Sequence, residues 1–557
     1  MASNRIKLGS NAVLFTALVI GIVVLANLMA SRLFARVDLT QDQIFTLSDA
    51  SKRMVANLPD RLTVKAFISK DLPHQQLRAI GRYLKDLLEE YARNSNGKMV
   101  WEALDPGKDE KIEQEARRLK VYPTRLSVRE KTKVSVTQGY LGVAFQYGGK
   151  VESLPFVADI ATLEYQISST IRRLTGKRKK VGFTSGHGEP SLFQGLKAAH
   201  DALKDHEVTT VDLTEGKNPI PDDVDLLVMV GPRKQLAQRA LYEIDRFLIK
   251  GKSVAMFIDG VVLETPRGHF QPGQVKPRIA RANVVGLRPM LRHYGVELGK
   301  DMIMDRQNQR VVLPVGQNQR VVTNYPAFPV VTNLSRESPI TKLLRAYVSV
   351  FPSSVKLTRA ARDAKEVTAA VLASSTAASW RQTGFFLFDP MRQPQPTKEL
   401  GPFTLALLLQ GEFRSYFAGK PVPAPGPAAP PRENEPSPSK TGPKSPAGTR
   451  LVVFGDADMV QDQFLGLNQA NLMLLQNTVD YLIEDVSMIG IRSKSQTRRP
   501  LKELDDDKVT LAKWVNIIGL PAAFVLLGFV RWRLRRASRR RQAARLLSGD
   551  SKPGSQT

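Results

Sequence analysis

Two apolar stretches stand near the ends of the chain, and a long region of mixed apolar and polar pattern separates them. Residues 11–30 carry no charged side chain, and their number matches the length that a helix needs to cross a bilayer. Residues 511–530 form the second stretch, with Trp514 and Trp532 placed as interfacial anchors. The pattern therefore predicts two transmembrane helices. A cleaved signal peptide is the alternative for the first, and a buried soluble helix for the second.

Charge predicts the orientation of these helices. An arginine-rich tail follows the second stretch: Arg531, Arg533, Arg535, Arg536, Arg539, Arg540 and Arg541. Because basic segments beside a membrane span stay in the cytoplasm, this tail is expected there. With two spans the N-terminus then also lies inside, and the intervening region lies outside. We expect a bacterial cytoplasmic-membrane protein with a periplasmic or extracytoplasmic main domain, and anionic lipid as a partner of the tail.

The region after the first span alternates helix and strand patterns. Residues 48–58 predict a helix capped by Ser48, residues 62–68 a strand, and residues 74–93 a helix with an apolar stripe. A strand at 99–104 and a helix at 108–119 follow, and then a hairpin-like pair at 132–147. This order predicts a small thioredoxin-like α/β unit. It has no CxxC motif and therefore no redox chemistry.

A second α/β unit begins near Lys179. Short, nearly all-apolar strands alternate with helices up to residue 260, the pattern of a doubly wound parallel sheet. The repeated segment QNQRVV, at 307–312 and 317–322, predicts a hairpin. A helix is expected at 191–204. Residues 421–448 are rich in proline, alanine, serine and lysine and predict a disordered insertion. The strand 451–454 after it is expected to complete the same sheet.

The fold class is therefore α/β, with a terminal transmembrane helix at each end. The predicted segments are a cytoplasmic N-terminus (1–10), a transmembrane helix (11–30), the small domain (31–155), the first part of the parallel-sheet domain (156–418), the insertion (419–449), the last strand and helix of that domain (450–490), a linker (491–510), a transmembrane helix (511–530) and a basic cytoplasmic tail (531–557).

Composition excludes several kinds of chemistry. The 557 residues include no cysteine, which rules out disulfides, thiolate catalysis and Cys-ligated zinc. The net charge of +28 first suggests nucleic acid or an anionic membrane surface. No nucleic-acid-binding motif accompanies the charge, so no nucleic-acid partner is expected. The tail explains only part of the positive excess.

The turn Ser185-Gly186-His187-Gly188-Glu189 is the first candidate ligand site. It directly follows a predicted strand, its glycines allow close backbone approach, and His187 and Glu189 could exchange protons. The alternative is a tight strand-to-helix turn that uses glycine for steric reasons. The segment matches neither a P-loop nor GxGxxG.

Asp456 and Asp458 form the second candidate, because they follow the apolar strand 451–454 and could bind a metal ion or another ligand at the edge of the sheet. Turn and helix-cap chemistry is the alternative. No HExxH motif, paired-histidine spacing or GxSxG nucleophile elbow occurs, so we expect no catalytic residues, no metal site and no cofactor.

An ordered set of segments resembles the auxiliary component of an ABC transporter of the gliding-motility (GldG) type. The matching segments are VDLTQDQIFTLSDASKRMV, LTVKAFISKDLP, LEYQISSTIRRLTGKRKKVGFTSGHGE, YPAFPVVTNL, SPITKLL, LVVFGDADMV and NLMLLQNTVDYLIED, between the two predicted spans. The resemblance implies an extracytoplasmic domain beside a permease, with a separate cytoplasmic ATPase. It also implies a second domain similar in fold to class I glutamine amidotransferases and to an intraflagellar transport subunit. The amidotransferase nucleophile is a cysteine, which this chain lacks.

Three functions follow as hypotheses. The first is a non-catalytic, membrane-anchored auxiliary subunit that works with a polytopic ABC permease and an ATPase. The second is an envelope or gliding-motility scaffold that binds protein or glycan without transport. The third is a membrane-tethered hydrolase that uses His187 or Asp456.

Overall fold

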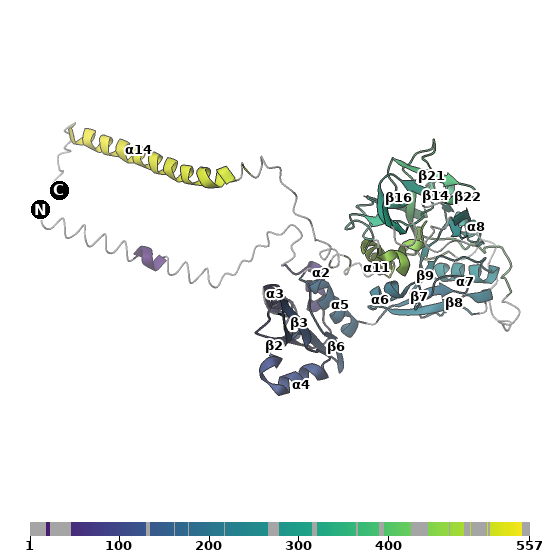
Figure 1. Ribbon diagram of the computed structural model, residues 1–557, viewed down its shortest axis with the longest axis horizontal. Helices are drawn as coiled ribbons and strands as arrows, with labels where there is room; N and C mark the ends of the chain where they lie inside the picture. Colours follow the sequence, from purple (N-terminus) through teal and green to yellow (C-terminus); the bar gives the residue numbers. More distant parts are fainter. Residues whose placement is uncertain are drawn as a thin grey trace, which may run out of the picture. The chain divides into compact units, whose positions relative to one another are not determined.

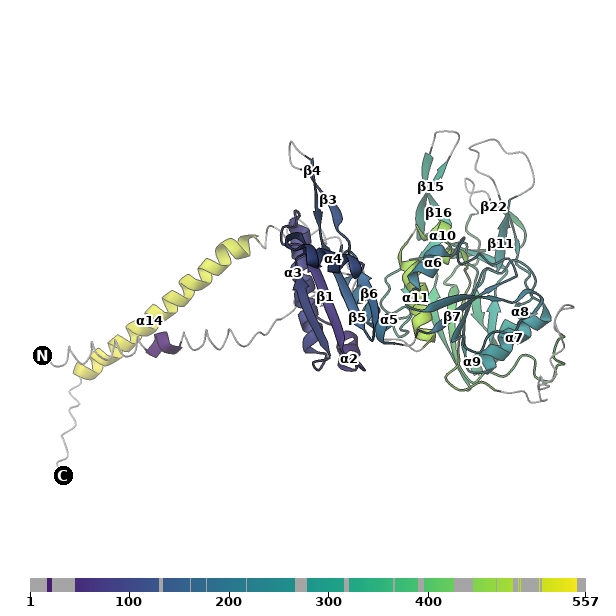
Figure 2. The same cartoon turned by 90° about the horizontal axis from the view of Figure 1, so that it is seen from below.

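The computed structural model describes residues 18–22, 46–129, 134–160, 162–176, 178–216, 218–265, 278–314, 320–363, 366–388, 395–424, 444–466, 468–483, 489, 491, 510 and 513–547. The chain divides into two units, residues 1–496 and 497–557. The first unit contains a small and a large α/β domain, so the mixed α/β class is confirmed. Figure 1 and Figure 2 show the elements of both domains.

The small domain is built on a four-stranded sheet with the order β2-β1-β5-β6. β1 runs parallel to β2 and antiparallel to β5, which is antiparallel to β6. The strands are β1 (Leu62–Ile68), β2 (Met99–Leu104), β5 (Leu141–Tyr147) and β6 (Lys150–Leu154). The helices are α2 (Asp49–Ala56), α3 (Gln75–Arg93), α4 (Glu110–Arg118) after the short helix η1 (Pro106–Lys108), and α5 (Leu163–Thr175).

Local sequence determines the helices of this domain as expected. The side chain of Ser48 accepts a hydrogen bond from the backbone of Ser51 and so caps α2. In α3 the predicted apolar stripe is buried, including Ile80, Leu84 and Leu88. These side chains belong to one core that also includes β1 and α5.

The predicted hairpin within residues 132–147 is wrong. The strand β4 (Val134–Gly139) pairs with β3 (Thr124–Arg129), whereas β5 pairs with β1 and β6. The turn that joins β5 to β6 contains Gly148 and Gly149, both at positive φ. Because two-residue hairpins favour residues that adopt positive φ, the Gly-Gly pair marks the real turn.

The large domain is built on an eight-stranded sheet. Its order is β17 (Asn333–Leu334), β20 (Val367–Ser374), β23 (Thr404–Gly411), β24 (Arg450–Phe454), β10 (Ser253–Phe257), β9 (Leu226–Val230), β7 (Lys180–Ser185) and β8 (Glu207–Asp212). The five strands from β24 to β8 are parallel, and β23, β20 and β17 extend the sheet with antiparallel pairings. β24 therefore joins β10 although the Pro-rich segment separates them in sequence.

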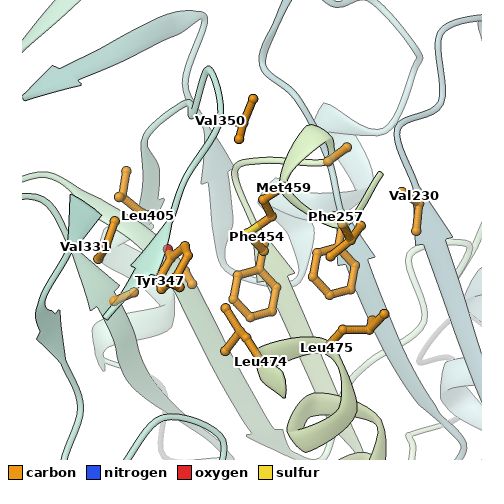
Figure 3. Close-up of a cluster of buried hydrophobic side chains, with 14 of the residues drawn as sticks. Val230, Phe257, Val331, Tyr347, Val350, Leu405, Phe454, Met459, Leu474 and Leu475 are labelled. Atoms are coloured by element: carbon orange, nitrogen blue, oxygen red, sulfur yellow. The ribbon is translucent and has the colours of Figure 1, made fainter. Parts of the chain in front are cut away.

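Alternate side chains of the parallel strands face two different cores. Leu226, Val228 and Val230 of β9 join the core that contains helix α11 (Ala470–Leu482), whereas Leu227 and Met229 join the core that contains α7 (Gln238–Ile249). Both faces are apolar because helices cover both. Figure 3 shows the first core, where the rings of Phe257 and Phe454 stack 4.7 Å apart beside Leu474 and Leu475.

Smaller sheets stand beside the main one. Their strands are β11 (Val261–Glu264), β12 (Arg278–Ala282) and β22 (Phe386–Phe388); β13 (Val296–Leu298) and β19 (Val355–Leu357); β14 (Asp301–Asp305) and β21 (Ser379–Thr383); and β15 (Asn308–Pro314), β16 (Arg320–Val331) and β18 (Tyr347–Val348). β15 and β16 pair antiparallel with Val312 opposite Val322, so the predicted hairpin of the QNQRVV repeat is confirmed.

Short helices complete the large domain: η2 (Thr214–Gly216), α6 (Lys197–Ala202), α8 (Arg288–His293), α9 (Arg359–Asp363), η3 (Asp458–Val460) and α10 (Asp462–Leu465). The helix predicted at 191–204 is reduced to α6. Gly195, at φ +102°, precedes α6, and a left-handed residue interrupts helical geometry.

Polar contacts join α5 of the small domain to the large domain. Asp205 accepts hydrogen bonds from Ser169 and from Arg173, whose Nη1 lies 2.6 Å from its carboxylate. Arg172 lies within 4.0 Å of Asp480 in α11, and His206 is hydrogen-bonded to the same carboxylate at 3.1 Å. Burial raises the pKa of Asp205, but its hydrogen bonds and the two arginines lower it to below its usual range.

One helix in the described part of the chain, Ile517–Ser538, is long and apolar enough to cross a membrane. It belongs to a continuous helical run formed by the π-helical turn η4 (Val515–Gly519) and α14 (Leu520–Leu547). Helical structure continues past residue 530 into the arginine-rich tail, and arginine is a good helix former. The predicted first span, 11–30, lies outside the described residues except for the helical, exposed residues 18–22.

Candidate functional site

The candidate residues lie at the carboxyl ends of the parallel strands. From β7 the chain adds β8 on one side of the sheet, and it then adds β9, β10 and β24 on the other side. The switch point lies between β7 and β9, and open α/β sheets bind ligands in the crevice at such a point. Ser185 ends β7, and Asp456 and Asp458 follow β24. We call this edge the crest of the sheet.

Two glycines shape the turn after β7. Gly186 has φ +107°, and a Cβ atom there would lie 2.3 Å from Oγ1 of Thr214. Gly188 has φ +84° and packs against Arg233. Ser185 accepts a hydrogen bond from the backbone of Leu213 through its carbonyl group. Backbone conformation and close packing thus both require glycine in this turn.

The turn is held in place through backbone groups of His187. Its carbonyl accepts hydrogen bonds from the amides of Arg233 and Lys234, both at 2.8 Å, and its amide donates to Oε2 of Glu189 at 2.6 Å. Oε1 of Glu189 accepts from the hydroxyl of Thr184 at 3.1 Å. Burial raises the pKa of Glu189, but the hydrogen bonds from His187 and from the backbone lower it below its usual range.

The His187 ring is 4% exposed, and its Nδ1 lies 3.8 Å from Oε1 of Glu189. Among the described residues this Nδ1 has no hydrogen-bond partner. The imidazole is therefore the one part of the turn with unused hydrogen-bonding capacity, while Glu189 is committed to the turn itself.

Asp456 is buried, and its carboxylate accepts three hydrogen bonds. Oδ2 accepts from the hydroxyl of Ser349 and the amide of Val350, both at 2.6 Å, and Oδ1 accepts from the amide of Met459 at 3.0 Å. Burial, with the repulsion of Asp259, raises the pKa of Asp456 well above its ordinary value. This carboxylate holds the segment before β19 against the crest and has little capacity left for a ligand.

Asp458 shares a cation with Asp259. Nη2 of Arg233 lies 2.8 Å from Asp259 and 3.2 Å from Asp458, and Gln461 donates to Asp458 at 2.7 Å. Burial, together with the negative charge of Asp259, raises the pKa of Asp458 to about 7. Burial also raises the pKa of Asp259, whose other oxygen accepts from the amide of Ala457.

The crest therefore brings together both segments predicted from sequence, 185–189 and Asp456 with Asp458. Arg233 links them, since its backbone holds His187 and its guanidinium pairs with Asp458. Sequence reasoning did not select Arg233, Asp259 or Ser349 as site residues. Arg233 and Asp259 each follow an apolar strand, and that position in the sequence could have identified them. Ser349 lies in a segment without a regular pattern, so nothing in the sequence indicated it.

The crest offers limited scope for chemistry. Within the described residues, no group of three or more histidine, aspartate or glutamate side chains is arranged to hold a metal ion. The acidic side chains accept hydrogen bonds from the chain's own donors. What is left for a ligand is the Nδ1 of His187 and a carboxyl at Asp458 that exchanges its proton near neutral pH.

Comparison with known families places the crest inside a recognised domain. A family model described as an ABC-type uncharacterized transport system matches residues 178–485, more than half of the chain. The chain belongs to this family. Both candidate segments of the crest lie within the match. The prediction of an ABC transporter auxiliary component is confirmed at this level.

Further similarities of this ABC-type transport-system protein cover the rest of the chain. Residues 41–146, in the small domain, match a domain of unknown function, DUF7088. An uncharacterized protein of Borreliella burgdorferi is 21% identical over 540 residues, which cover 94% of this chain and 98% of that protein. The similarity therefore extends through both domains.

A solved structure titled mmIFT52 N-terminal domain is 12% identical, and the similarity covers 54% of this chain and 97% of that structure, with a TM-score of 0.32. At that score the likeness carries no inference about this chain.

Proposed function

We propose that this chain is a non-catalytic, membrane-anchored auxiliary subunit of a GldG-type ABC transporter. In this proposal its two α/β domains stand outside the cytoplasm, beside a polytopic permease that a separate cytoplasmic ATPase drives. Membership of the ABC-type transport-system family supports a role in such a system. The ordered segments quoted above support the GldG type.

The observation that carries the proposed topology is the continuous helix from Val515 to Leu547. Its apolar half passes directly into an arginine-rich half. The guanidinium groups of Arg533 and Arg536 lie over the rings of Phe529 and Trp532, at 5.5 Å and 5.1 Å from the ring centroids. Aromatic rings beside arginines are typical of a membrane–water interface, and the arginines beyond them suit anionic lipid on the cytoplasmic side.

The crest supports a non-catalytic role. A general base and a nucleophile need free, mutually oriented groups. Here Glu189 stabilises its own turn, and Asp456 anchors the backbone at Val350 and Met459. Of the two residues that the hydrolase hypothesis names, Asp456 is thus used in the fold. The His187 imidazole remains, but Glu189 beside it is committed to its own turn.

Two finer fold assignments belong to the same proposal. The small domain has a mixed sheet of order β2-β1-β5-β6 with a following helix, which supports a thioredoxin-like unit. The five parallel strands of the large sheet, doubly wound with helices on both faces, support a similarity to class I glutamine amidotransferases. Neither assignment implies the chemistry of those enzymes, because the chain has no cysteine.

The absence of cysteine allows a direct test of topology. Single cysteines introduced as Asn96→Cys in the exposed part of the small domain and as Ser551→Cys in the tail would be labelled with a membrane-impermeant maleimide in spheroplasts. We expect the first to react at once and the second only after permeabilisation. Labelling of both in intact spheroplasts, or of neither, would overturn the proposed topology.

Co-purification tests the partners. The full-length chain, extracted in mild detergent from its native membrane, should bring down a permease of several spans and an ATPase with Walker motifs. The matched control is a chain truncated after residue 510, which loses the C-terminal helix. Recovery of the full-length chain without either partner would favour the scaffold hypothesis and refute this one.

A further inference from the structure

A basic cleft lies in the large domain, and none of the crest residues described above lines it. It has a volume of about 740 Å³ and is lined by residues of β12, α8, β13, β14, β19 and β21. Six cationic side chains and two carboxyl groups line it: Arg281, Arg288, Arg292, Lys300, Lys356 and Arg381, with Glu297 and Asp301. This local excess of positive charge is part of the net charge that the arginine-rich tail does not explain.

Three of the six cations are paired with carboxylates. Arg281 pairs with Glu264, Arg292 with Glu297 at 3.2 Å, and Arg381 with Glu399 at 2.5 Å. These pairs are largely exposed at the rim. Each pair holds two long side chains in place, and the positive and negative charges of a pair nearly cancel.

The other three cations are not balanced in this way. Among the residues that the structure describes, Lys300 and Lys356 have no ion-pair partner. The guanidinium of Arg288 donates to the carbonyl groups of Gly260 and Gly299, which are neutral acceptors. Its buried Nε has no hydrogen-bond partner within the described chain. Burial lowers the pKa of Arg288, and the nearby charges of Asp301 and Glu297 offset this only in part.

The carboxyl groups of the cleft wall, Glu297 and Asp301, both attract the guanidinium of Arg288. Glu297 is paired with Arg292 at 3.2 Å, which leaves Asp301, whose Oδ2 also lies 4.0 Å from Arg381. Both of its oxygens already accept hydrogen bonds from Ser354, at 2.9 Å from the amide and 2.7 Å from the hydroxyl. Three unbalanced cations against one carboxylate leave about two positive charges in the cleft.

The rim also provides an apolar contact. Phe385 lines the cleft and is 76% exposed, so its ring is accessible to a ligand. A ligand that combines an anionic group with a carbon skeleton would cover this ring.

We propose that the cleft between β13, β14 and β19 binds a phosphomonoester, with the phosphoryl group held by Lys300, Lys356 and Arg288 and the organic part against Phe385. A phosphomonoester carries between 1.5 and 2 negative charges at pH 7 and has three strong acceptor oxygens, so it matches the unbalanced charge. A monocarboxylate would neutralise only half of it. The ligand is either a soluble phosphomonoester or a lipid with a phosphomonoester headgroup, since both present the same group.

Calorimetric titration of the full-length chain in non-ionic detergent tests the proposal with three probes. Glycerol 3-phosphate represents the soluble source, dihexanoyl phosphatidic acid represents the lipid source, and glycerate is the monocarboxylate control. We expect at least one phosphomonoester to bind at least tenfold more tightly than glycerate. Tighter binding of glycerol 3-phosphate assigns the soluble source, and tighter binding of phosphatidic acid assigns the lipid source.

The variants Lys300→Gln and Lys356→Gln should each weaken phosphomonoester binding by about tenfold, because each removes one charge-assisted hydrogen bond. The control Lys342→Gln removes an equal charge from an exposed site outside the cleft and should leave binding unchanged. Unfolding midpoints equal to that of the wild type would show that the variants fold.

The proposal would be overturned if neither phosphomonoester bound with a Kd below about 10 mM. It would also be overturned if glycerate bound as tightly as the phosphomonoesters, or if the Lys300 and Lys356 variants bound them as tightly as the Lys342 variant.

Discussion

The crest and the basic cleft are two polar regions of the large domain that differ in how their charged groups are balanced. At the crest, Asp456 is buried and accepts hydrogen bonds from a hydroxyl and two backbone amides. In the cleft, Lys300 and Lys356 have no carboxylate partner within the described chain, and the adjacent Arg288 has a buried, unpaired Nε. In the first region the chain's own donors satisfy the Asp456 carboxyl group, whereas in the second the lysines have no carboxylate partner among the described residues.

This difference separates structural polarity from polarity available to a ligand. Buried groups that are fully hydrogen-bonded stabilise one conformation, and their removal leaves donors unsatisfied. Unbalanced like charges contribute nothing favourable to folding and are retained where a counter-ion arrives from outside. Removing a crest residue should therefore affect stability, and removing a cleft lysine should affect binding alone.

The largest effect is expected at Asp456. Replacement by alanine would leave the amides of Val350 and Met459 and the hydroxyl of Ser349 without their acceptor in a buried site. Each unsatisfied buried donor costs about 1–3 kcal/mol, so the free energy of unfolding should fall by about 4 kcal/mol. Urea denaturation followed by circular dichroism measures this loss. Ser349→Ala, which removes one of the three bonds, should cost only about 1 kcal/mol. Equal losses would show that Asp456 is not the centre of the cluster.

Gly186 should come next. The change Gly186→Ala places a Cβ atom against Thr214 at a positive φ, so both strain and overlap oppose it. We expect a loss of about 3 kcal/mol in the same denaturation measurement. Gly448→Ala is the matched control, because nothing lies within 4 Å of its added Cβ. If both variants were equally stable, the steric explanation of the Gly-His-Gly turn would be wrong.

Asp458 should make the stability of the crest depend on pH. Its pKa is raised to about 7, above that of an unfolded aspartate near 4, so the folded state binds the proton more tightly. The contribution of Asp458 to the free energy of unfolding should consequently be largest below pH 4. It should fall as pH rises from about 4 to about 7.

Asp458→Asn removes that dependence. Between pH 5 and pH 8 the stability of the variant relative to the wild type should rise by about 2.5 kcal/mol, because about two pH units of the fall lie in this range. Denaturation curves at both values measure the difference. A variant that lost stability at pH 8 would show that the ion pair with Arg233 outweighs burial.

The smallest effect on stability is expected in the cleft. The double variant Lys300→Gln/Lys356→Gln should unfold within about 0.5 kcal/mol of the wild type, because neither ammonium group pairs with a described carboxylate. Lys65→Gln is a useful contrast, since Lys65 forms ion pairs of 2.8 Å with Glu102 and Glu115. If the free energy of unfolding of the double variant fell by more than about 1 kcal/mol, the lysines of the cleft would contribute to stability as the crest residues do.

Local pattern predicted the elements well. Alternating apolar residues predicted β1, an apolar stripe predicted α3, and continuous apolar runs predicted β9 and β10. These predictions succeed because burial on one face or on both faces of an element determines its apolar pattern. Pairing was harder to predict. No strand is predicted at 124–129, so the sequence pattern leaves β4 only its successor as a candidate partner, whereas its real partner is β3.

The candidate site was predictable only in part. The parallel sheet brings strand ends to one edge, so residues 185–189 and Asp456 could be expected near one another. Ser349 could not, because residues 261–350 show no regular pattern that would place them. The cleft was invisible for a related reason. Its cations are scattered from Arg281 to Arg381, and each alone resembles an ordinary surface charge.

The place of β24 in the sheet has a consequence for how this chain folds. β24 lies between β10 and β23, and Val254 pairs with Leu451 across nearly two hundred residues. A strand that closes the middle of a sheet from so far along the chain gives a high contact order and slow folding. Until residue 454 has been synthesised, β10 and β23 present open edges that can pair with other chains. The large domain therefore cannot be shortened from its C-terminal side, and a nascent chain of this protein is exposed to aggregation until its last strand arrives.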